Sequence, residues 1–373
     1  MNSTMGIIIT GGRNEKLKEL SKKRSVTAIP IGGKYRAIDF VLSNMVNSGI
    51  TKVGVVTQFS SRSLMDHLGS GKEWDLDRRN GGLHIFPPYL EGDSIGMYRG
   101  SAEGMYNNLS FLKRSSEEYV IVAMGNGIYN MRYDDLLEFH INKEADITIL
   151  YRDMVDYQTE ELRNLGIIGI DDDGRITDLL EKPMTPKTTK ASMGVYIIKR
   201  TLLVELLEES AAHGNYDFVK DILIKKIPER KIFGFEYKGY WRSLSSIPLY
   251  FKCNMELLNP EISDELFANG GKIFTKVKDE TPAKYNDEAE VTNSVVADGC
   301  IIEGTVINSV LFRGVVVNKG CVIKDSIIMQ DSILEENVML ENVILDKEVV
   351  ITKDRELKAE KSYPMIVGKG STI

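Results

Sequence analysis

Three short stretches of this sequence carry residue types that suit phosphate and sugar chemistry. Gly11-Gly12 ends a short apolar run, and glycines at such a place let backbone N–H groups cradle a phosphate. Gly125-Asn126-Gly127 ends a second apolar run, and Glu181-Lys182 joins a carboxylate to a point positive charge. Each stretch also has a plain alternative, because Gly-Asn-Gly is good turn chemistry and Glu181-Lys182 can be an exposed ion pair of little energetic value.

The first 250 residues alternate between strand-like and helix-like segments, which must position these stretches. Strands are predicted at Gly6 to Thr10, Lys52 to Thr57, Tyr119 to Met124 and Asp146 to Tyr151, with a helix over Ile38 to Ser48. This alternation predicts a largely parallel sheet covered by helices on both faces. Ligands of that architecture bind beyond the carboxyl ends of the strands, so we expect the site in the loops after Thr10 and Met124.

A different pattern begins near Val291. Apolar residues recur at short intervals, often of five or six positions, at Val295, Ile301, Val306, Val316, Val322, Val338, Val343 and Val349. Short strands at this spacing predict the coils of a hexapeptide-type parallel β-helix, in which each coil buries its face on its neighbours. The alternative is a small domain of antiparallel strands. We therefore expect an α/β domain over residues 1–255, a polar linker over 256–289 and a β-helix over 290–373.

Length, charge and composition limit the classes of protein to which this chain can belong. The 373 residues exceed the size at which single cores stop growing, so two domains are expected. The net charge of −7 argues against a nucleic-acid or membrane-surface role, and no apolar stretch is long enough for a transmembrane helix. The N-terminus lacks the features of a signal peptide, and Cys253, Cys300 and Cys321 offer neither a disulfide framework nor a zinc spacing. We therefore expect a cytoplasmic protein.

Several longer blocks follow one another along nearly the whole chain. They are Gly11-Gly12, Arg24, Pro30 to Phe40, Leu42 to Ile50, Tyr98 to Ala102, Glu181 to Pro183, Ser192 to Tyr196, Asp217 to Asp221, Cys300 to Gly304 and Asn308 to Gly314. In this order they resemble the bacterial glucose-1-phosphate adenylyltransferases, also called ADP-glucose pyrophosphorylases. The resemblance implies a Rossmann-like nucleotidyltransferase domain of the GT-A type, followed by a left-handed parallel β-helix.

That family joins glucose 1-phosphate to ATP and releases ADP-glucose and pyrophosphate in glycogen biosynthesis. The resemblance implies a glycine-rich phosphate loop, a basic residue on the leaving pyrophosphate, and Mg²⁺ held by carboxylates. It also implies substrate contacts at Gly11, Gly12, Tyr98, Gly100, Glu181, Lys182, Ser192 and Tyr196.

The phosphate loop departs from the family pattern Gly-Gly-x-Gly-Thr-Arg-Leu. Asn14 adds a side chain where a glycine would let the backbone approach phosphate closely, and Glu15 brings a negative charge. Lys16 stands at the arginine position without the bidentate guanidinium, and Val26-Thr27 replaces Lys-Pro. We therefore expect Lys16 to be a degenerate catalytic residue.

The metal positions depart further. Asn126 stands where the family has the aspartate of Gly-Asp-His, and Ser243 where it has the aspartate of Trp-x-Asp-Val-Gly-Thr. Both offer only neutral oxygens, whereas Mg²⁺ sites are usually built on one or two carboxylates plus substrate phosphates. We expect a degenerate catalytic position at Asn126, no metal ligands in this chain, and weak or absent Mg²⁺ binding.

This combination most resembles the GlgD-type regulatory subunit, which implies a heterotetramer with a homologous catalytic subunit whose activity it raises. The family's effector-binding basic pair matches Lys23 and Arg24, which otherwise belong to a solvated charge run.

Three other functions stay open at this point. They are a working nucleotidyltransferase with a divergent loop, a sugar-phosphate sensor without a catalytic partner, and a hexapeptide-repeat acyltransferase or bifunctional enzyme that uses the β-helix for acetyl transfer. The four histidines, His67, His84, His140 and His213, all precede the β-helix, so an acyltransferase would lack its usual base there.

Overall fold

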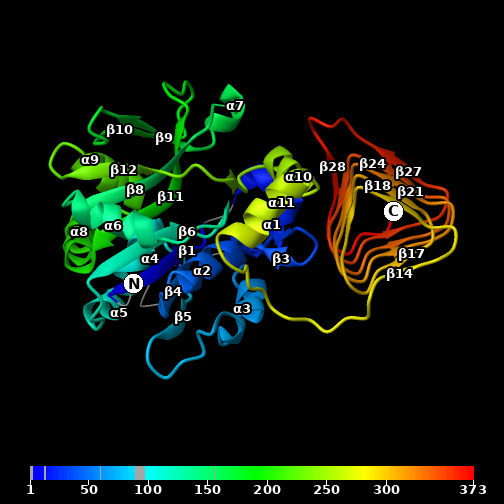
Figure 1. Cartoon of the computed structure of the whole chain (residues 1–373), viewed down its shortest axis with the longest axis horizontal. Coiled ribbons are helices and arrows are strands. Elements are labelled where there is room, and N and C mark those ends of the chain that lie inside the picture. Colours follow the sequence, from blue (N-terminus) through cyan, green and yellow to red (C-terminus); the bar gives the residue numbers. More distant parts are fainter. Residues whose placement is uncertain (1–2, 12–13, 59, 89–96, 156) are drawn as a thin grey trace.

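The computed structural model describes residues 3–11, 14–58, 60–88, 97–155 and 157–373. Figure 1 shows two parts, an α/β domain that contains the N-terminus and a triangular coil of strands that contains the C-terminus. Among the helices of these described residues, none combines the length and the hydropathy needed to cross a membrane.

A nine-stranded sheet forms the centre of the α/β domain, in the order β10-β9-β11-β6-β1-β4-β5, with β8 beside β11 and β12 beside β8. The strands are β1 (Thr4–Ile9), β4 (Lys52–Val56), β5 (Gly82–Phe86), β6 (Tyr119–Met124), β8 (Ile147–Asp153), β9 (Gly166–Ile170), β10 (Ile176–Glu181), β11 (Lys190–Lys199) and β12 (Ile232–Glu236). The four strands predicted from apolar runs are confirmed with ends shifted by at most two residues.

The direction of the strands differs from the prediction. β6, β1, β4 and β5 run parallel, but β11 is antiparallel to its neighbours β6, β8 and β9, and β9 and β10 are also antiparallel to each other. The sheet is therefore mixed rather than largely parallel. The reason is that a buried apolar run has the same composition in either direction. The sequence of β11 therefore did not indicate that this strand is antiparallel to its neighbours.

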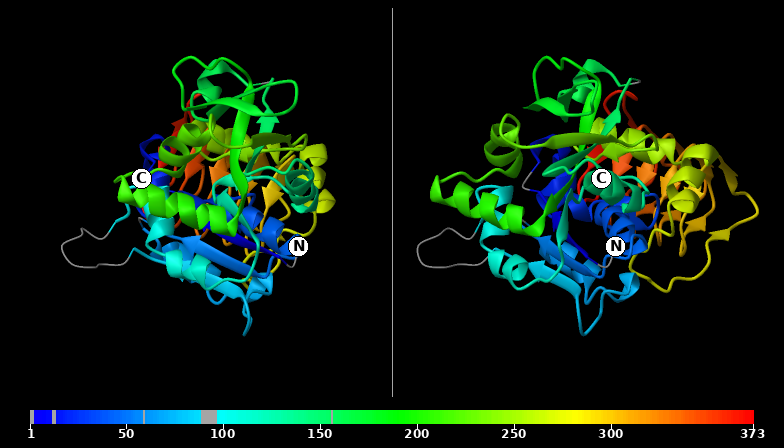
Figure 2. Two further views of the ribbon diagram at one scale, coloured as in Figure 1. Left: turned by 90° about the vertical axis from the view of Figure 1, so that its left-hand side faces the viewer. Right: turned by 60° about the vertical axis from the view of Figure 1, so that its left-hand side comes forward.

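Helices cover both faces of the sheet, as expected (Figure 2). The α-helices are α1 (Glu19–Lys22), α2 (Ala37–Asn47), α3 (Arg62–Leu68), α4 (Ser101–Tyr106), α5 (Leu109–Lys113), α6 (Asp134–Asn142), α7 (Thr159–Leu162), α8 (Arg200–Ala212), α9 (Ile224–Lys226), α10 (Ile247–Glu256) and α11 (Pro260–Asp264). Strand residues alternate between two cores, so that Ile8 packs with α2, α3 and α6, whereas Ile7 packs with α4, α5 and α8.

Short helices and two-residue strands complete the α/β domain. They are the 3-10 helices η1 (Glu15–Leu17), η2 (Val26–Ala28) and η3 (Lys72–Trp74), the π-helices η4 (Phe218–Leu223) and η5 (Glu265–Asn269), and the strands β2 (Pro30–Ile31), β3 (Tyr35–Arg36), β7 (Gly127–Ile128) and β13 (Arg242–Ser243).

The C-terminal part consists of three parallel five-stranded sheets, which is consistent with a left-handed β-helix. The first holds β14 (Lys284–Tyr285), β17 (Ile301–Ile302), β20 (Val316–Val317), β23 (Ile333–Leu334) and β26 (Val350–Ile351). The second holds β15 (Glu290–Thr292), β18 (Thr305–Ile307), β21 (Val322–Lys324), β24 (Met339–Glu341) and β27 (Glu356–Lys358). The third holds β16 (Val295–Val296), β19 (Val310–Leu311), β22 (Ile327–Ile328), β25 (Val343–Leu345) and β28 (Met365–Val367). Because every pair is parallel, the alternative of antiparallel strands is wrong.

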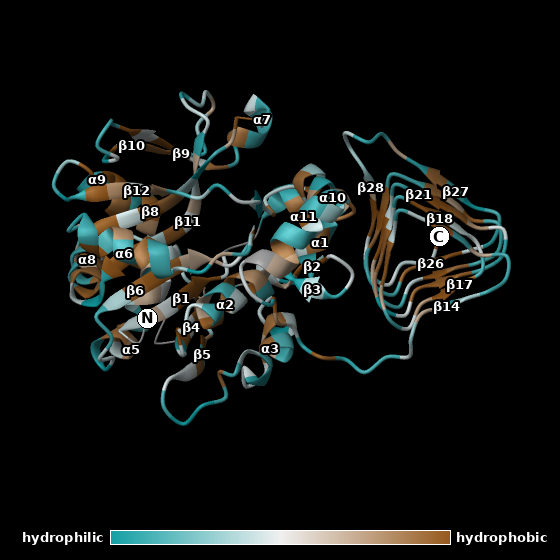
Figure 3. Ribbon diagram, viewed as in Figure 1, coloured by the Kyte–Doolittle hydropathy of each residue, from teal (hydrophilic) through white to brown (hydrophobic). Residues whose placement is uncertain are grey.

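The third sheet of the β-helix packs against the α/β domain. Outward residues of that sheet, among them Val310, Ile327 and Ile344, share one buried cluster with Ile31 and Tyr250. Figure 3 shows apolar residues along these facing walls. The expected linker contains α11, η5 and β14 as well as an extended segment, and the domain boundaries that we gave stay a prediction.

Candidate active site

The loops after β1 and β6 lie side by side. β1 and β6 are parallel neighbours with Ile9 opposite Met124, and the Gly125 N–H donates to the Ile9 carbonyl at 3.0 Å. A methyl group at Gly125 would lie 2.7 Å from Thr27 Cγ2, so η2 packs directly under this edge of the sheet. The edge is therefore bordered by the phosphate loop, by η2 and by the turn that contains Asn126.

The two positions that match the family's metal ligands are neighbours. β7 pairs antiparallel with β13, which puts Ser243 opposite Gly127. The Leu244 N–H donates to the Asn126 carbonyl at 3.1 Å, and Asn126 Nδ2 donates to Ser243 Oγ at 3.3 Å. These two half-buried side chains therefore satisfy each other as a neutral donor and acceptor.

The phosphate loop is held by one of its substituted residues. Gly11 has a φ of +71°, a conformation that favours glycine. Asn14 Nδ2 donates to the Ser245 carbonyl at 2.9 Å, and Asn14 Oδ1 accepts from the Lys16 N–H at 3.0 Å. The asparagine thus caps η1 and ties the loop to the segment that follows β13, an interaction that a glycine cannot make.

Lys16 contacts a segment that is distant in the sequence. Its Nζ donates to Asn164 Oδ1, in the segment between α7 and β9. The next carbonyl, that of Leu165, accepts from the Lys182 N–H at 3.1 Å. Lys16 therefore contacts the segment that is hydrogen-bonded to the expected sugar-phosphate residue Lys182. No feature of the sequence had marked Asn164.

The expected sugar residues form one row across three strands. Glu181 lies opposite Gly166, and Gly166 lies opposite Ser192. A methyl group at Gly166 would lie 3.2 Å from Glu181 Oε2 and 3.6 Å from Ser192 Cβ, so the glycine leaves room between them. Lys182 is 63% exposed, and its Nζ lies 3.4 Å from Glu181 Oε1. Burial raises the pKa of Tyr196, which keeps this phenol neutral beside the row.

Tyr98 and Gly100 have evident packing roles. The Tyr98 side chain is buried, and its hydroxyl donates to the Pro87 carbonyl at 3.1 Å. A methyl group at Gly100 would lie 2.3 Å from the Tyr216 carbonyl oxygen, which only a glycine allows. Substrate contact by these two residues stays a prediction, as does that by Gly12, which lies outside the described residues.

The expected effector pair divides between two environments. Lys23 is exposed. Arg24 is 5% exposed, and its Nη2 donates to Asp346 Oδ1 and Oδ2 at 2.7 and 2.9 Å. Because Asp346 belongs to the β-helix, Arg24 forms a buried ion pair between the two domains.

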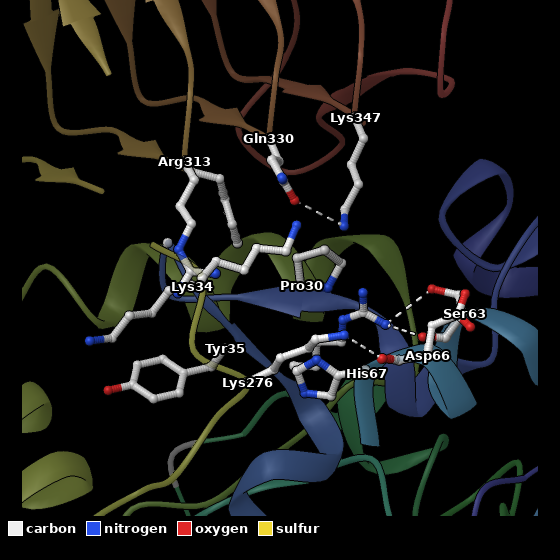
Figure 4. Close-up of a pocket in the computed structure, with 14 residues that line it drawn as sticks. Pro30, Lys34, Tyr35, Ser63, Asp66, His67, Lys276, Arg313, Gln330 and Lys347 are labelled. Carbon is white, nitrogen blue, oxygen red and sulfur yellow. Dashed lines mark hydrogen bonds between the residues drawn. The ribbon is translucent and has the colours of Figure 1, made fainter. Parts of the chain in front are cut away.

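A cleft beside that ion pair gathers positive charge from both domains (Figure 4). Its cationic lining residues are Lys34, Arg36, Lys276, Lys278, Arg313 and Lys347. Within the described ranges, none of these six makes an ion pair with a carboxylate. Burial lowers the pKa of Arg36 to about 10, and no described residue offers a hydrogen-bond partner to the buried Nε of Arg313. The cleft therefore suits an anion.

Comparisons with known proteins identify the family of each domain. The family model described as nucleotidyl transferase matches residues 5–259, and the one described as GlmU-like C-terminal hexapeptide matches residues 279–362. Proteins named glucose-1-phosphate adenylyltransferase from Geobacillus stearothermophilus and Bacillus subtilis are each 38% identical over 314 residues, 83% of this chain and 80% and 82% of theirs. That from Thermotoga maritima is 38% identical over 319 residues, covering 84% of this chain and 75% of its own. The chain belongs to the glucose-1-phosphate adenylyltransferase family.

The adenylyltransferase family implies Mg²⁺, and the residues at Asn126 and Ser243 do not fit it. An amide and a hydroxyl carry no charge, and each already bonds the other. Across the part of the chain that the structure describes, no group of three or more His, Cys, Asp or Glu residues is placed to hold a metal ion. A nucleotidyltransferase domain is thus present, and the neutral side chains of Asn126 and Ser243 offer no negative charge for Mg²⁺.

Proposed function

We propose that this chain is a cytoplasmic subunit of a glucose-1-phosphate adenylyltransferase in glycogen biosynthesis, and that it regulates a catalytic partner while turning over little substrate itself. The observation that carries the proposal is the neutral pair Asn126 and Ser243 at the edge of β1 and β6. Joining glucose 1-phosphate to ATP brings several phosphate charges together, and catalysis depends on neutralising them. This pair supplies no negative charge to hold a divalent cation for that purpose.

Glu181, Lys182 and Ser192, which we call the sugar side of the site, support binding of glucose 1-phosphate or ADP-glucose. Glu181 and Ser192 offer acceptor oxygens for sugar hydroxyls in one row, and Lys182 offers an exposed ammonium for a phosphate. On the nucleotide side Asn14 and Lys16 are engaged with other parts of the chain. We therefore expect the sugar ligands to bind better, relative to the family norm, than ATP with Mg²⁺ does.

The surface of the β-helix supports assembly with a homologous catalytic subunit, in a hetero-oligomer such as a heterotetramer. Ile301, Val316 and Ile333 are paired in register on the first sheet, and Ile301 and Ile333 are 39% and 40% exposed. On the second sheet Val322 and Met339 are paired and are 37% and 50% exposed. Contiguous apolar residues at a surface favour contact with another protein.

The cationic cleft supports binding of an anionic effector. An anion there would contact residues of both domains, and Asp346, the partner of Arg24, is the direct neighbour of the cleft residue Lys347. Effector binding would thereby alter the interface between the domains. In this proposal Arg24 acts through its ion pair, and Lys23 remains a surface cation.

The alternative is a catalytically competent nucleotidyltransferase with a divergent loop. It is favoured by the complete row at Glu181, Gly166 and Ser192 and by the cation kept at Lys16. A sensor that has no catalytic partner is separated from the first proposal by copurification with a homologous chain.

The experiment combines this chain with a homologue that carries the complete loop and both aspartates. Pyrophosphate release from ATP and glucose 1-phosphate is measured for the homologue alone and for the mixture, over a range of ATP and glucose 1-phosphate concentrations. We expect mixing to raise the homologue's activity and to produce one mixed species in light scattering. Independent species with unchanged kinetics would refute the regulatory role.

A further inference from the structure

The amine of Lys347 differs from the other cations of the cleft in its surroundings. Lys347 follows β25 and points down into the cleft from the β-helix, as Figure 4 shows. Its side chain is half-buried, and its Nζ has a single weak contact, 3.4 Å from Gln330 Oε1. The neighbouring carboxylate, that of Asp346, is already bound by Arg24 through both oxygens. Among the residues that the structure describes, the Lys347 ammonium therefore has no carboxylate partner of its own.

Charged groups face Lys347 from every element around it. Arg24 and Arg36 belong to the α/β domain, Lys278 to the extended segment, and Asp346 and Asp331 to turns of the β-helix. The other charged residues that line the cleft are Lys34, Asp66, Lys276 and Arg313. Burial, followed by repulsion from Arg36, Arg24 and Lys278, lowers the pKa of Lys347 to about 7, and Asp346 opposes this only in part.

We propose that binding of a dianion of the sulfate or phosphate type in this cleft adds a proton to the Lys347 amine, so that the cleft binds such anions more weakly as the solution becomes more alkaline. The inference rests on the proposed function of the cleft as an anion site. A bound dianion reverses the local balance of charge, because an opposite charge at close range favours the ammonium form. The amine that is only partly protonated in the free cleft becomes fully protonated in the complex.

The sign of the pH dependence follows directly. Below pH 7 the free cleft already holds the proton, and binding is strongest there. Above it, binding must first add the proton, so affinity falls as pH rises. With a free pKa of about 7, affinity falls about tenfold between pH 6 and pH 8, and binding at pH 7 takes up about half a proton.

His67 is the other group of the cleft with an ordinary pKa near neutrality. It is 6% exposed, and its Nε2 lies 2.6 Å from Asp39 Oδ1. Burial lowers the pKa of His67 despite this carboxylate, which favours the neutral ring. A His67→Gln variant therefore serves as the matched control for proton uptake at a second group.

The test uses sulfate, whose own charge does not change between pH 6 and pH 8. Calorimetric titration of the full chain in two buffers of different protonation enthalpy gives the number of protons taken up. We expect uptake in the wild type and in His67→Gln. Lys347→Arg keeps a permanent charge, so it should bind sulfate without uptake and without pH dependence. Lys347→Met should bind more weakly at pH 6 and also without uptake.

Lys182→Ala removes the exposed ammonium of the sugar side, so titrations in that background isolate the cleft. Uptake that persists in Lys347→Arg, or wild-type binding with no uptake, would overturn the inference while leaving the cleft as an anion site. Absence of sulfate binding in the Lys182→Ala chain would instead overturn the function proposed for the cleft. Thermal unfolding of each variant shows whether it is folded.

Discussion

Replacing Asn126 and Ser243 by aspartate together tests whether these two positions form one cation site. Their polar atoms lie 3.3 Å apart. Two carboxylates at that distance would repel each other by about 5 kcal/mol at an effective dielectric constant of about 20, before rotation or protonation relieves them. We therefore expect the double variant to be less stable than the wild type without metal, with the pKa of one carboxyl raised by the other.

Mg²⁺ should restore the stability of the double variant. Each 1 kcal/mol of relieved repulsion raises the unfolding temperature by about 2–4 °C in a domain of this size, so calorimetric melting with and without Mg²⁺ measures the effect. The matched control, Asn126→Ala with Ser243→Ala, removes the hydrogen bond without adding charge and should not respond to Mg²⁺. A double aspartate variant that ignores Mg²⁺ would refute the reasoning.

Turnover by the same double aspartate variant tests whether the substitutions in the phosphate loop also limit activity. The phosphate loop and the metal position act on one transition state. The effects of their substitutions on the rate should therefore be strongly non-additive. The two aspartates alone should yield little pyrophosphate release, and more should appear when Asn14→Gly, Glu15→Thr, Lys16→Arg and Val26→Lys are added. Full activity from the two aspartates would mean that the loop substitutions are harmless.

Three further predictions concern the domain interface, the sugar side and assembly. Arg24→Met leaves the Asp346 charge buried without its partner, so urea unfolding should show a loss of about 3–5 kcal/mol, which Arg24→Met with Asp346→Leu should largely recover. Lys182→Ala should weaken glucose 1-phosphate binding in calorimetry by about tenfold, about the value of a charge-assisted hydrogen bond, whereas Lys187→Ala, another exposed lysine, should not. Ile333→Glu places a charge among the exposed apolar residues of the first β-helix sheet and should reduce the mass of the mixed assembly in light scattering. An unchanged mass would show that this surface does not hold the assembly together.

Local patterns in the sequence were enough for much of the fold. The apolar run from Tyr119 to Met124 became β6 without change, because a buried strand flanked by polar residues has clear ends. The short spacing of apolar residues such as Val316 and Val322 predicted the β-helix, because equivalent positions of successive coils pair in register. The family blocks located Asn126 and Ser243, which the fold brings into contact.

Features built from distant segments could not be read in the same way. The cleft combines Arg36, Lys278 and Lys347, and no spacing in the sequence relates them. Arg24 stands in a run of basic residues that looks solvated, yet its partner lies in the β-helix. Such contacts depend on how the domains pack, and composition along the chain does not encode that packing.

The rate of pyrophosphate release by the isolated chain, with ATP, glucose 1-phosphate and Mg²⁺, tests the central claim most directly. The neutral pair at Asn126 and Ser243 predicts a rate far below the usual enzyme range, and one that does not rise as Mg²⁺ is increased. A wild-type chain that turns over at about 1–10³ s⁻¹ on its own, with saturable dependence on Mg²⁺, would contradict the account.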